Sequence, residues 1–444
     1  MPKSLGTYLA DLEQLRPGEL VRVEREVAPG NYDCTAIVKQ LAALKKFPAL
    51  LFERPRGLDG RVSDVRLLLS AETTQGKVQV ALGLPFGTSR GEMGNECLRR
   101  EGSPIPPTLL PAEQAPVKEV SRHGEAASLF ALPLMRHHEL DSGPYVLMVS
   151  VMRRRDSGAH TTSFHRMEVK GPRLAAFVLA PRPWEVFRAY EDRDEECPVA
   201  TVLGHHPAFN IGAVARAGSD DVGYERIGAY LQESLRVTPS TTWGERLLVP
   251  ADAEVVVEGA LLPHQRLSDG PFGEAAGYTE PELHEGVLRY EVRAITCRRR
   301  AIAQSILTPE GEKPWLELAR EATYLRRARE VVPTVAAVCK AGRHAYFNVF
   351  VAMKKTSEGD PGRVAAALLG FDQAKHVFVF DDDVDVYDPA AVLAALAWRV
   401  QPHAQVHVGK PMMKGSWLDP SLRAKGSGRG STMIVDATRP LARL

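Results

Sequence analysis

Ser268-Asp269-Gly270-Pro271-Phe272-Gly273-Glu274 is the stretch around which the chain is organised. It places two carboxylates five residues apart on a backbone that can hardly be a helix or a plain strand. Gly270 and Gly273 can take positive φ at little cost, and Pro271 fixes its own φ. A turn of this kind can direct both acids into one cavity, where the low dielectric sets their protonation states. Ordinary surface loops share this composition, so the stretch gains meaning only from its context.

The overall composition bounds the class of protein. The chain has 444 residues, enough for two or three domains, and its 56 Lys+Arg nearly balance its 55 Asp+Glu. This balance gives no reason to expect a nucleic-acid partner. No segment approaches the roughly 18 to 20 apolar residues of a membrane span, and the start, Met1-Pro2-Lys3-Ser4, lacks an apolar signal core. Five scattered cysteines without a C-x-x-C pair argue against disulfides and structural zinc, so we expect a soluble cytoplasmic protein with no membrane partner.

Helices and strands alternate in the first quarter of the chain. Apolar residues at helical spacing predict a helix over 4–15, and alternation predicts a strand over 20–27. A helix over 35–44 and a strand over 49–52 are expected next, a pattern typical of an α/β module. The prolines of Ser103-Pro104-Ile105-Pro106-Pro107 exclude regular structure, so we expect this module to span residues 1–110.

Strand patterns dominate the central part, residues 111–305. Candidate strands at 146–152, 174–179, 200–203, 253–259 and 291–298 are separated by Gly/Pro turns. Many strands with few helices suggest a barrel or a sandwich. The expected helical exception is 223–235, which places Tyr224, Ile227, Leu231 and Ser234 on one face.

The last part, residues 306–444, begins with the best helical pattern in the chain. Pro314 suits a first turn, and the apolar residues of 314–331 form one face, as in a linker helix between domains. Strand patterns at 346–351 and 376–380 then alternate with helical patterns at 361–369 and 389–398. This alternation predicts a second α/β module.

Several other stretches accompany the opening turn. In chain order they are Gly18-Glu19-Leu20-Val21-Arg22-Val23, Leu132-Pro133-Leu134, Arg136-His137-His138-Glu139, Gly143-Pro144-Tyr145, Ser163-Phe164-His165-Arg166, Val377 to Asp388, and Asp436-Ala437-Thr438. Together with the turn, which matches Glu/Asp-Gly-Pro-Phe/Tyr-Gly-Glu/Asp, they resemble the UbiD family of decarboxylases. The resemblance covers nearly the whole chain. It implies an α/β fold with an N-terminal α/β module, a central split β-barrel that holds a flavin, and a C-terminal α/β domain that builds a homodimer or homohexamer.

The resemblance also implies an activity. The family reversibly decarboxylates aromatic, heteroaromatic or α,β-unsaturated carboxylic acids without oxidation, with prenylated FMN that a flavin prenyltransferase supplies. A cofactor fits the chemistry, because protein side chains are poor electron sinks for the departing CO₂. The matching catalytic positions are Arg166, Asp269 and Glu274. Arg166 would hold the acids by charge-assisted hydrogen bonds, Glu274 would donate the proton, and Asp269 would tune the pKa of Glu274.

The positions that hold the cofactor phosphate depart from the family pattern. The family binds Mn²⁺ and K⁺ there through an Asn, a His and a Glu, and these positions read Thr161, a residue near Pro183, and Glu233. A threonine hydroxyl is a weak metal ligand and proline is none, so Glu233 is the one metal candidate left. Arginine can bind a phosphate bidentately without a metal. The candidate cofactor contacts are Thr161, Ser163, Phe164, His165, Arg182, Arg216 and Glu233, with Lys425 and Arg429 in a basic segment farther on.

Three interpretations remain open from the sequence. The first is a decarboxylase with an altered phosphate anchor, which the presence of Arg166, Asp269 and Glu274 favours. The second is a non-catalytic UbiD-like subunit or scaffold that does not bind the flavin in the usual way, which the altered metal positions favour. The third is an enzyme that uses another cofactor in the same barrel.

Other polar residues favour structural interpretations. His165 adjoins Arg166 on an expected strand and should face the opposite way. The pairs His137-His138 and His205-His206 fail the same geometric test as metal sites. The run Asp381-Asp382-Asp383 could bind a divalent cation through oxygen ligands, but it follows an apolar strand, so we expect a solvated loop.

Overall fold

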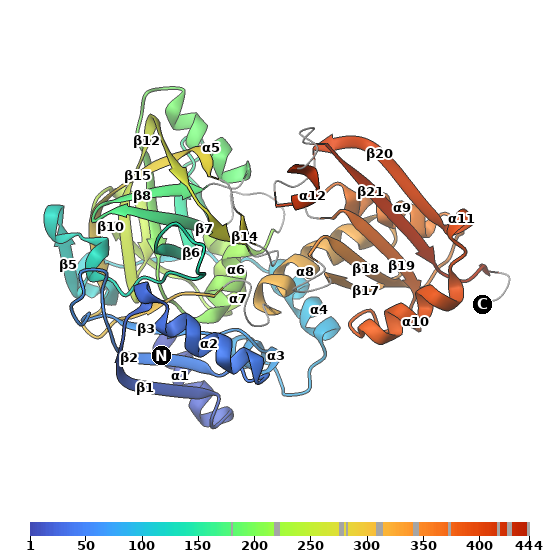
Figure 1. Cartoon of the computed structure of the whole chain (residues 1–444), viewed down its shortest axis with the longest axis horizontal. Helices are drawn as coiled ribbons and strands as arrows, with labels where there is room; N and C mark the ends of the chain where they lie inside the picture. The colour runs from blue at the N-terminus through green and yellow to red at the C-terminus, as the bar shows by residue number, and fades with distance from the viewer. Residues whose placement is uncertain are drawn as a thin grey trace. The chain divides into compact units, whose positions relative to one another are not determined.

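The computed structural model describes residues 1–178, 181–216, 223–274, 279–280, 283–307, 314–340, 346–371, 374–414, 418–423 and 429–441 (Figure 1). The chain forms two compact units. The first comprises Met1–Phe86 and Arg100–Trp315, and the second comprises Gly87–Arg99 and Leu316–Leu444. The division into three modules at residues 110 and 305 stays a prediction.

The first unit contains a four-stranded sheet with the order β1 (Leu20–Val27), β2 (Ala49–Pro55), β3 (Arg66–Leu69) and β16 (Ile302–Gln304). Helices α1 (Leu5–Leu15), α2 (Asp33–Ala43) and α3 (Gln75–Leu82) accompany these strands in the chain. The helices and strands predicted within the first 52 residues are confirmed. The sheet is not built from the N-terminal segment alone, because β16 comes from more than 200 residues farther along and pairs in parallel with β3.

Local sequence explains where α1 begins and which face it buries. The Ser4 side chain accepts a hydrogen bond from the Thr7 backbone N–H, and the Thr7 hydroxyl accepts one from the Ser4 backbone N–H. This capping box satisfies two donors that a helix start leaves without partners. The predicted apolar stripe of α1 is buried and consists of Leu5, Tyr8, Leu9 and Leu12.

Six antiparallel strands of the first unit form a closed barrel (Figure 1). Their order is β12-β9-β6-β7-β8-β15, and β15 pairs back to β12. The central barrel is therefore present. Its strands are β6 (Tyr145–Arg153), β7 (His160–Gly171), β8 (Leu174–Val178), β9 (Cys197–Val202), β12 (Val255–Asp269) and β15 (His284–Cys297).

Smaller pairings surround the barrel. β5 (Val120–His123) pairs with β15. A three-stranded sheet has the order β11 (Gly244–Pro250), β10 (Arg236–Ser240) and β4 (Thr108–Leu109). β13 (Phe272–Gly273) pairs with β14 (Thr279–Glu280) shortly after the end of β12, so the stretch from Asp269 to Glu274 leaves the barrel at this point.

The register of β6 against β7 separates two faces of the barrel wall. Met148 pairs with His165, and Val146 pairs with Met167. Val146, Met148 and Met167 belong to the buried apolar cluster of the barrel, so this face points inward. Residues of β7 that alternate with His165 and Met167 therefore point outward.

The central part contains more helices than expected. Besides α7 (Gly223–Leu231), the structure has α5 (Pro181–Glu191) and α6 (Pro207–Val214). The expectation of one helical exception was wrong, because both added helices start with a proline, which fits a first helical turn as well as it breaks an interior. The predicted helix over 223–235 ends at Leu231, so Ser234 lies beyond it.

The second unit contains a five-stranded sheet. The order is β17 (Val335–Lys340), β18 (Asn348–Met353), β19 (His376–Asp381), β21 (Arg429–Ala437) and β20 (Val406–Lys414). It contains α9 (Asp360–Leu369), α10 (Pro389–Arg399), α11 (Pro402–Gln405) and α12 (Pro420–Arg423), and most of α4 (Arg90–Glu101) and α8 (Pro314–Val331), whose ends at 100–101 and 314–315 belong to the first unit. The second α/β module and the helix over 314–331 are confirmed.

The apolar face of α8 is used inside the chain. Its residues Leu325 and Ala328 pack in the core of the second unit and are buried. Because they are buried there, they are not available for a contact between subunits. Exposed apolar residues lie instead on α10, where the exposed fraction is 66 % for Leu393 and 90 % for Trp398. Among the described helices, none is long and apolar enough to cross a membrane.

Candidate active site

The three residues of the expected catalytic network lie together in the first unit. Arg166 stands on β7 opposite Leu147 of β6, on the outward face of the barrel wall. Asp269 is the last residue of β12, and Glu274 follows β13. The Arg166 Nε and Nη2 atoms donate hydrogen bonds to Asp269 Oδ2 over 3.1 and 2.6 Å, and Nη1 donates to Glu274 Oε1. One guanidinium therefore joins two acids that are more than 100 residues away in sequence.

Burial sets the electrostatics of this cluster. The exposed fraction is 0 % for Asp269, 4 % for Glu274 and 7 % for Arg166. Burial raises the pKa of Asp269, while the Arg166 charge and its hydrogen bonds oppose the rise. Asp269 Oδ1 has no hydrogen-bond partner among the described residues. A buried carboxylate oxygen without a partner is costly, so this atom is suited to receive a donor from a bound molecule or a water.

Aromatic rings lie beside the guanidinium. The Arg166 guanidinium lies over the Phe272 ring, 4.6 Å from its centroid, which is a cation–π geometry. The Tyr145 ring lies 4.4 Å from that of Phe272, and both side chains are buried. The outward face of the barrel at this point thus combines one cation, two acids and apolar aromatic surface.

The turn between the two acids has the special backbone that its sequence predicts, but only at one glycine. Gly270 has φ +95°, which favours glycine, and its N–H donates to Glu168 Oε2 over 3.1 Å. Gly273 has no positive φ. Its lack of a side chain matters for another reason, because a Cβ atom there would overlap the imidazole of His138.

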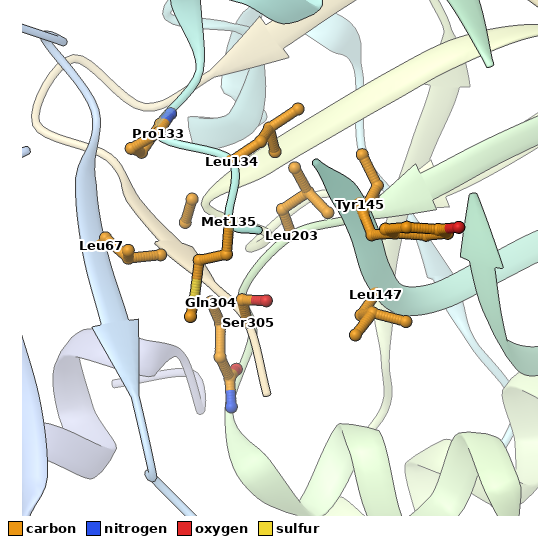
Figure 2. Close-up of a pocket in the computed structure, with 11 residues that line it drawn as sticks. Leu67, Pro133, Leu134, Met135, Tyr145, Leu147, Leu203, Gln304 and Ser305 are labelled. Atoms are coloured by element: carbon orange, nitrogen blue, oxygen red, sulfur yellow. The ribbon is translucent and has the colours of Figure 1, made fainter. Parts of the chain in front are cut away.

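A small cavity lies near this region, between the barrel and the four-stranded sheet (Figure 2). Its lining includes Tyr145 and Leu147, which share the outward face of the barrel wall with Arg166. Figure 2 also shows Met135 and Gln304 beside it. The remaining lining residues are Leu67, Pro133, Leu134, Val146, Leu203, Ala303 and Ser305.

Two of the candidate cofactor contacts lie on the opposite face from Arg166. His165 is buried, and its ring bonds to the Ser163 hydroxyl and, over 3.2 Å, to the Val178 carbonyl. Burial lowers the pKa of His165 to about 4, so the ring is neutral near pH 7. Ser163 and His165 thus form a pair on the inward face of β7, which agrees with the structural interpretation of His165. Phe164 is on the same face as Arg166, and its ring centroid lies 5.9 Å from that of Trp315.

The described residues do not assemble the metal site that the family pattern suggests. Thr161 adjoins Gly223 at the start of α7, whereas Glu233 lies beyond the end of that helix. Glu233 Oε1 accepts a hydrogen bond from the Lys3 backbone N–H over 2.6 Å. No group of three potential metal-ligating side chains occurs in the described part of the chain. With a hydroxyl, a proline and an occupied carboxylate, this donor set does not fit a divalent cation.

The basic candidates for the phosphate are placed only in part. Arg216 is partly buried just after α6, and Arg429 is exposed at the start of β21. The Arg182 side chain and Lys425 lie outside the described residues.

The other polar clusters singled out in the sequence have structural partners. His206 Nδ1 accepts the Ala208 N–H and caps α6, and His205 stacks on Phe209. Asp381 is 3 % exposed and pairs with Arg399, so the expectation of a solvated loop was wrong for this residue. Its neighbour Asp383 pairs with the same guanidinium.

Two acids of the site were not predicted from the sequence. Glu168 follows Arg166 by two residues on β7, so the period of a strand places both on one face and could have identified it. Asp141 accepts the Gly273 N–H over 2.8 Å. Nothing in the local sequence indicates this contact, because the two residues are 132 positions apart.

Comparisons with known proteins cover almost the entire chain. Residues 109–311 match the family model for the 3-octaprenyl-4-hydroxybenzoate carboxy-lyase Rift-related domain. Residues 315–437 match the model for the C-terminal domain of the same carboxy-lyase. The phenolic acid decarboxylase of a Streptomyces species is 29 % identical, over 99 % of this chain and 92 % of its own length.

Solved structures agree with these matches. The UbiD-class enzyme HmfF from Pelotomaculum thermopropionicum, in complex with FMN, is 31 % identical with a TM-score of 0.86, and the match covers 99 % of this chain and 94 % of that one. An evolved dimeric form of the same enzyme was solved with prFMN. Vanillic acid decarboxylase from Sedimentibacter hydroxybenzoicus is 30 % identical with a TM-score of 0.86, over 99 % and 93 % of the two chains. The chain therefore belongs to the UbiD family of carboxy-lyases.

Proposed function

We propose that the protein is a decarboxylase that removes CO₂ from an aromatic carboxylic acid with prenylated FMN as its cofactor. The observation that carries the proposal is the buried cluster of Arg166, Asp269 and Glu274 on the outward face of the barrel. Burying two acids around one guanidinium adds little net stability, because the cost of removing the charges from water offsets their attraction. A non-catalytic scaffold would therefore have no need of such a cluster. Relatives that carry flavin and act on phenolic acids support the choice of cofactor and substrate class.

The cofactor would supply the electron sink for the departing CO₂. The residues of this chain would supply binding and protons. Arg166 would fix the two acids and offer positive charge close to a substrate carboxylate. Phe272 and Tyr145 would keep water away from the guanidinium, which strengthens its electrostatic effect.

Glu274 is the proposed proton donor, and Asp269 the acid that tunes it. Both contact the same guanidinium, so loss of a proton from one changes the energy of the other. Among the described residues Asp269 Oδ1 has no partner, which leaves it able to bond to substrate or product. The same arrangement can return a proton to Glu274 and supports the reverse carboxylation as well.

For the cofactor phosphate we propose an anchor without a divalent metal. A flavin phosphate carries about two negative charges, and burial without counter-charge costs several kcal/mol. Arg182 and Arg216 are the first candidates because arginine binds phosphate bidentately. Titration of the purified protein with prenylated FMN should give the same affinity in manganese and in EDTA. Binding that requires manganese would overturn the metal-free anchor.

The decisive test of the function is Glu274→Gln. Gln keeps the shape and hydrogen-bonding reach of Glu but has no proton to transfer. In protein produced with a flavin prenyltransferase, CO₂ release from vanillic acid and other phenolic acids should fall by about 100-fold or more, with Tm nearly unchanged. Turnover at the wild-type rate would refute the assignment of Glu274.

The second candidate is a non-catalytic UbiD-like subunit, and the misfit of the metal donors at Thr161 and Glu233 favours it. This candidate predicts that the purified protein does not bind prenylated FMN under any of these conditions. The absorbance spectrum and the cofactor mass of the purified protein separate the two candidates.

A further inference from the structure

Two segments that are distant in sequence exchange hydrogen bonds at the turn that carries the acids. The Ser142 N–H donates to the Pro271 carbonyl over 2.9 Å. In return, the Gly273 N–H donates to Asp141 Oδ1 over 2.8 Å. The two bonds hold the turn on both sides of Phe272, immediately before Glu274.

Asp141 also organises its own segment. Its Oδ2 accepts the backbone N–H groups of His137 and His138 over 3.0 and 2.8 Å. The residue is 1 % exposed, and burial raises its pKa while the three N–H donors lower it. One buried carboxylate therefore satisfies three backbone donors from two segments with its two acceptor oxygens.

The contact between the segments is close as well as hydrogen-bonded. His138 lies so near Gly273 that a Cβ atom at Gly273 would overlap its ring. The Tyr145 hydroxyl lies 3.4 Å from the Pro271 carbonyl. The segment 137–145 therefore forms the support against which the turn rests.

We propose that Asp141 is a positioning residue, which fixes the backbone at Gly273 and so holds the Glu274 carboxyl at the Arg166 guanidinium. This inference rests on the proposed function, since Glu274 is the proposed proton donor. Asp141 acts through the backbone and not on the reacting atoms. A displacement of the acid by about 1 Å can reduce turnover by about 100-fold.

Asp141→Asn should remove the hydrogen bond to Gly273 and keep those to His137 and His138. The side-chain amide keeps the shape of the carboxylate but has one acceptor oxygen and one NH₂ group. Two N–H donors face Oδ2 and one faces Oδ1, so the amide oxygen should turn toward His137 and His138. The NH₂ group would then face the Gly273 N–H, and the bridge to the turn would be lost while the segment 137–141 keeps its bonds.

Asp360→Asn is the matched control. Asp360 is also fully buried, and its Oδ2 accepts the backbone N–H groups of Thr356 and Ser357, both over 2.9 Å. It belongs to the second unit, whereas the turn belongs to the first. By the same reasoning its amide oxygen keeps both backbone bonds, so this substitution removes a buried carboxylate charge, which pairs with Arg363, outside the proposed site.

The first readout is amide hydrogen exchange resolved to single residues, on the full-length protein. The Gly273 N–H should be protected in the wild type and exchange at least about 10-fold faster in Asp141→Asn. The Gly270 N–H, bonded to Glu168, should keep its protection. An unprotected Gly273 N–H in the wild type would overturn the proposal even if the variant failed to fold, and so would unchanged protection in the variant.

The second readout is the kinetics of CO₂ release from vanillic acid by protein that carries prenylated FMN. Asp141→Asn should lower kcat by about 10- to 100-fold and leave KM within about threefold, and Asp360→Asn should change neither. Equal losses of kcat in both variants, or normal kcat in Asp141→Asn despite lost Gly273 protection, would overturn the proposal. Absence of turnover in the wild type would refute the proposed function, and the exchange of Gly273 would still decide whether Asp141 holds the turn.

Discussion

Arg166→Ala tests whether the buried guanidinium is what allows two carboxylates to share the site. Arg166 contacts Asp269 and Glu274, and both acids are almost completely buried. Removal of the guanidinium leaves two buried acids without their counter-charge, a change that costs about 3–5 kcal/mol. Loss of the contact with Phe272 adds about 1 kcal/mol.

The destabilisation should depend on pH. Burial already raises the pKa of Asp269 against the opposing effect of Arg166, so without Arg166 this pKa rises further. A carboxyl with a raised folded-state pKa contributes stability below its unfolded-state pKa and loses it as the pH rises through the folded value. The stability difference between Arg166→Ala and wild type should therefore be smaller at pH 5 than at pH 8.

Thermal unfolding at these two pH values measures the effect. In a unit of about 300 residues, a loss of 3–5 kcal/mol lowers Tm by about 5–8 °C. A triple variant that adds Asp269→Asn and Glu274→Gln should recover most of the loss at pH 8, because the stranded charges are gone. A fall in Tm below about 2 °C, an equal fall at both pH values, or no recovery in the triple variant would refute the reasoning.

Three further predictions concern other parts of the chain. Burial raises the pKa of Glu254 to about 7, so the stability that this residue contributes is lost as the pH rises from about 5 to 8. Glu254→Gln should therefore flatten the fall of Tm over this pH range. An unchanged slope of Tm against pH would contradict the shift. Gly273→Ala should lower Tm and CO₂ release because the new methyl group meets His138, whereas Gly94→Ala, whose methyl group has open space, should do neither. Trp398→Glu should convert a homodimer or homohexamer to monomers in sedimentation if the exposed face of α10 is the interface, and an unchanged oligomer would exclude that face.

Local signals allowed much of the fold to be predicted from the sequence. The apolar spacing in α1, the proline at position 314 and the alternation along β1 act within a few residues, and each identified an element. The prolines that begin α5 and α6, Pro181 and Pro207, misled the prediction, because a proline that starts a helix and one that breaks it look alike without the neighbouring turn.

The sequence predicted the site residues that lie in local motifs, but not the contacts between distant segments. Arg166, Asp269 and Glu274 lie in recognisable motifs, and the structure brings them together. The bridge from Asp141 to Gly273 depends on how two distant segments pack, so a local pattern contains no sign of it. The contact of Glu233 with Lys3 joins residues 230 positions apart and was missed for the same reason.

The assignment of residues 87–99 to the second unit has a consequence for biosynthesis. This segment leaves the ribosome about 220 residues before Leu316, where the rest of its unit begins. At about 5–20 residues per second, it waits roughly 10–45 s for its partners. During that time Arg90 lacks Glu317 and Glu321, with which it later pairs. The second unit thus completes its folding only after the first has been synthesised. A single cut in the gene cannot yield the two units separately, because α4 would be separated from the rest of the second unit.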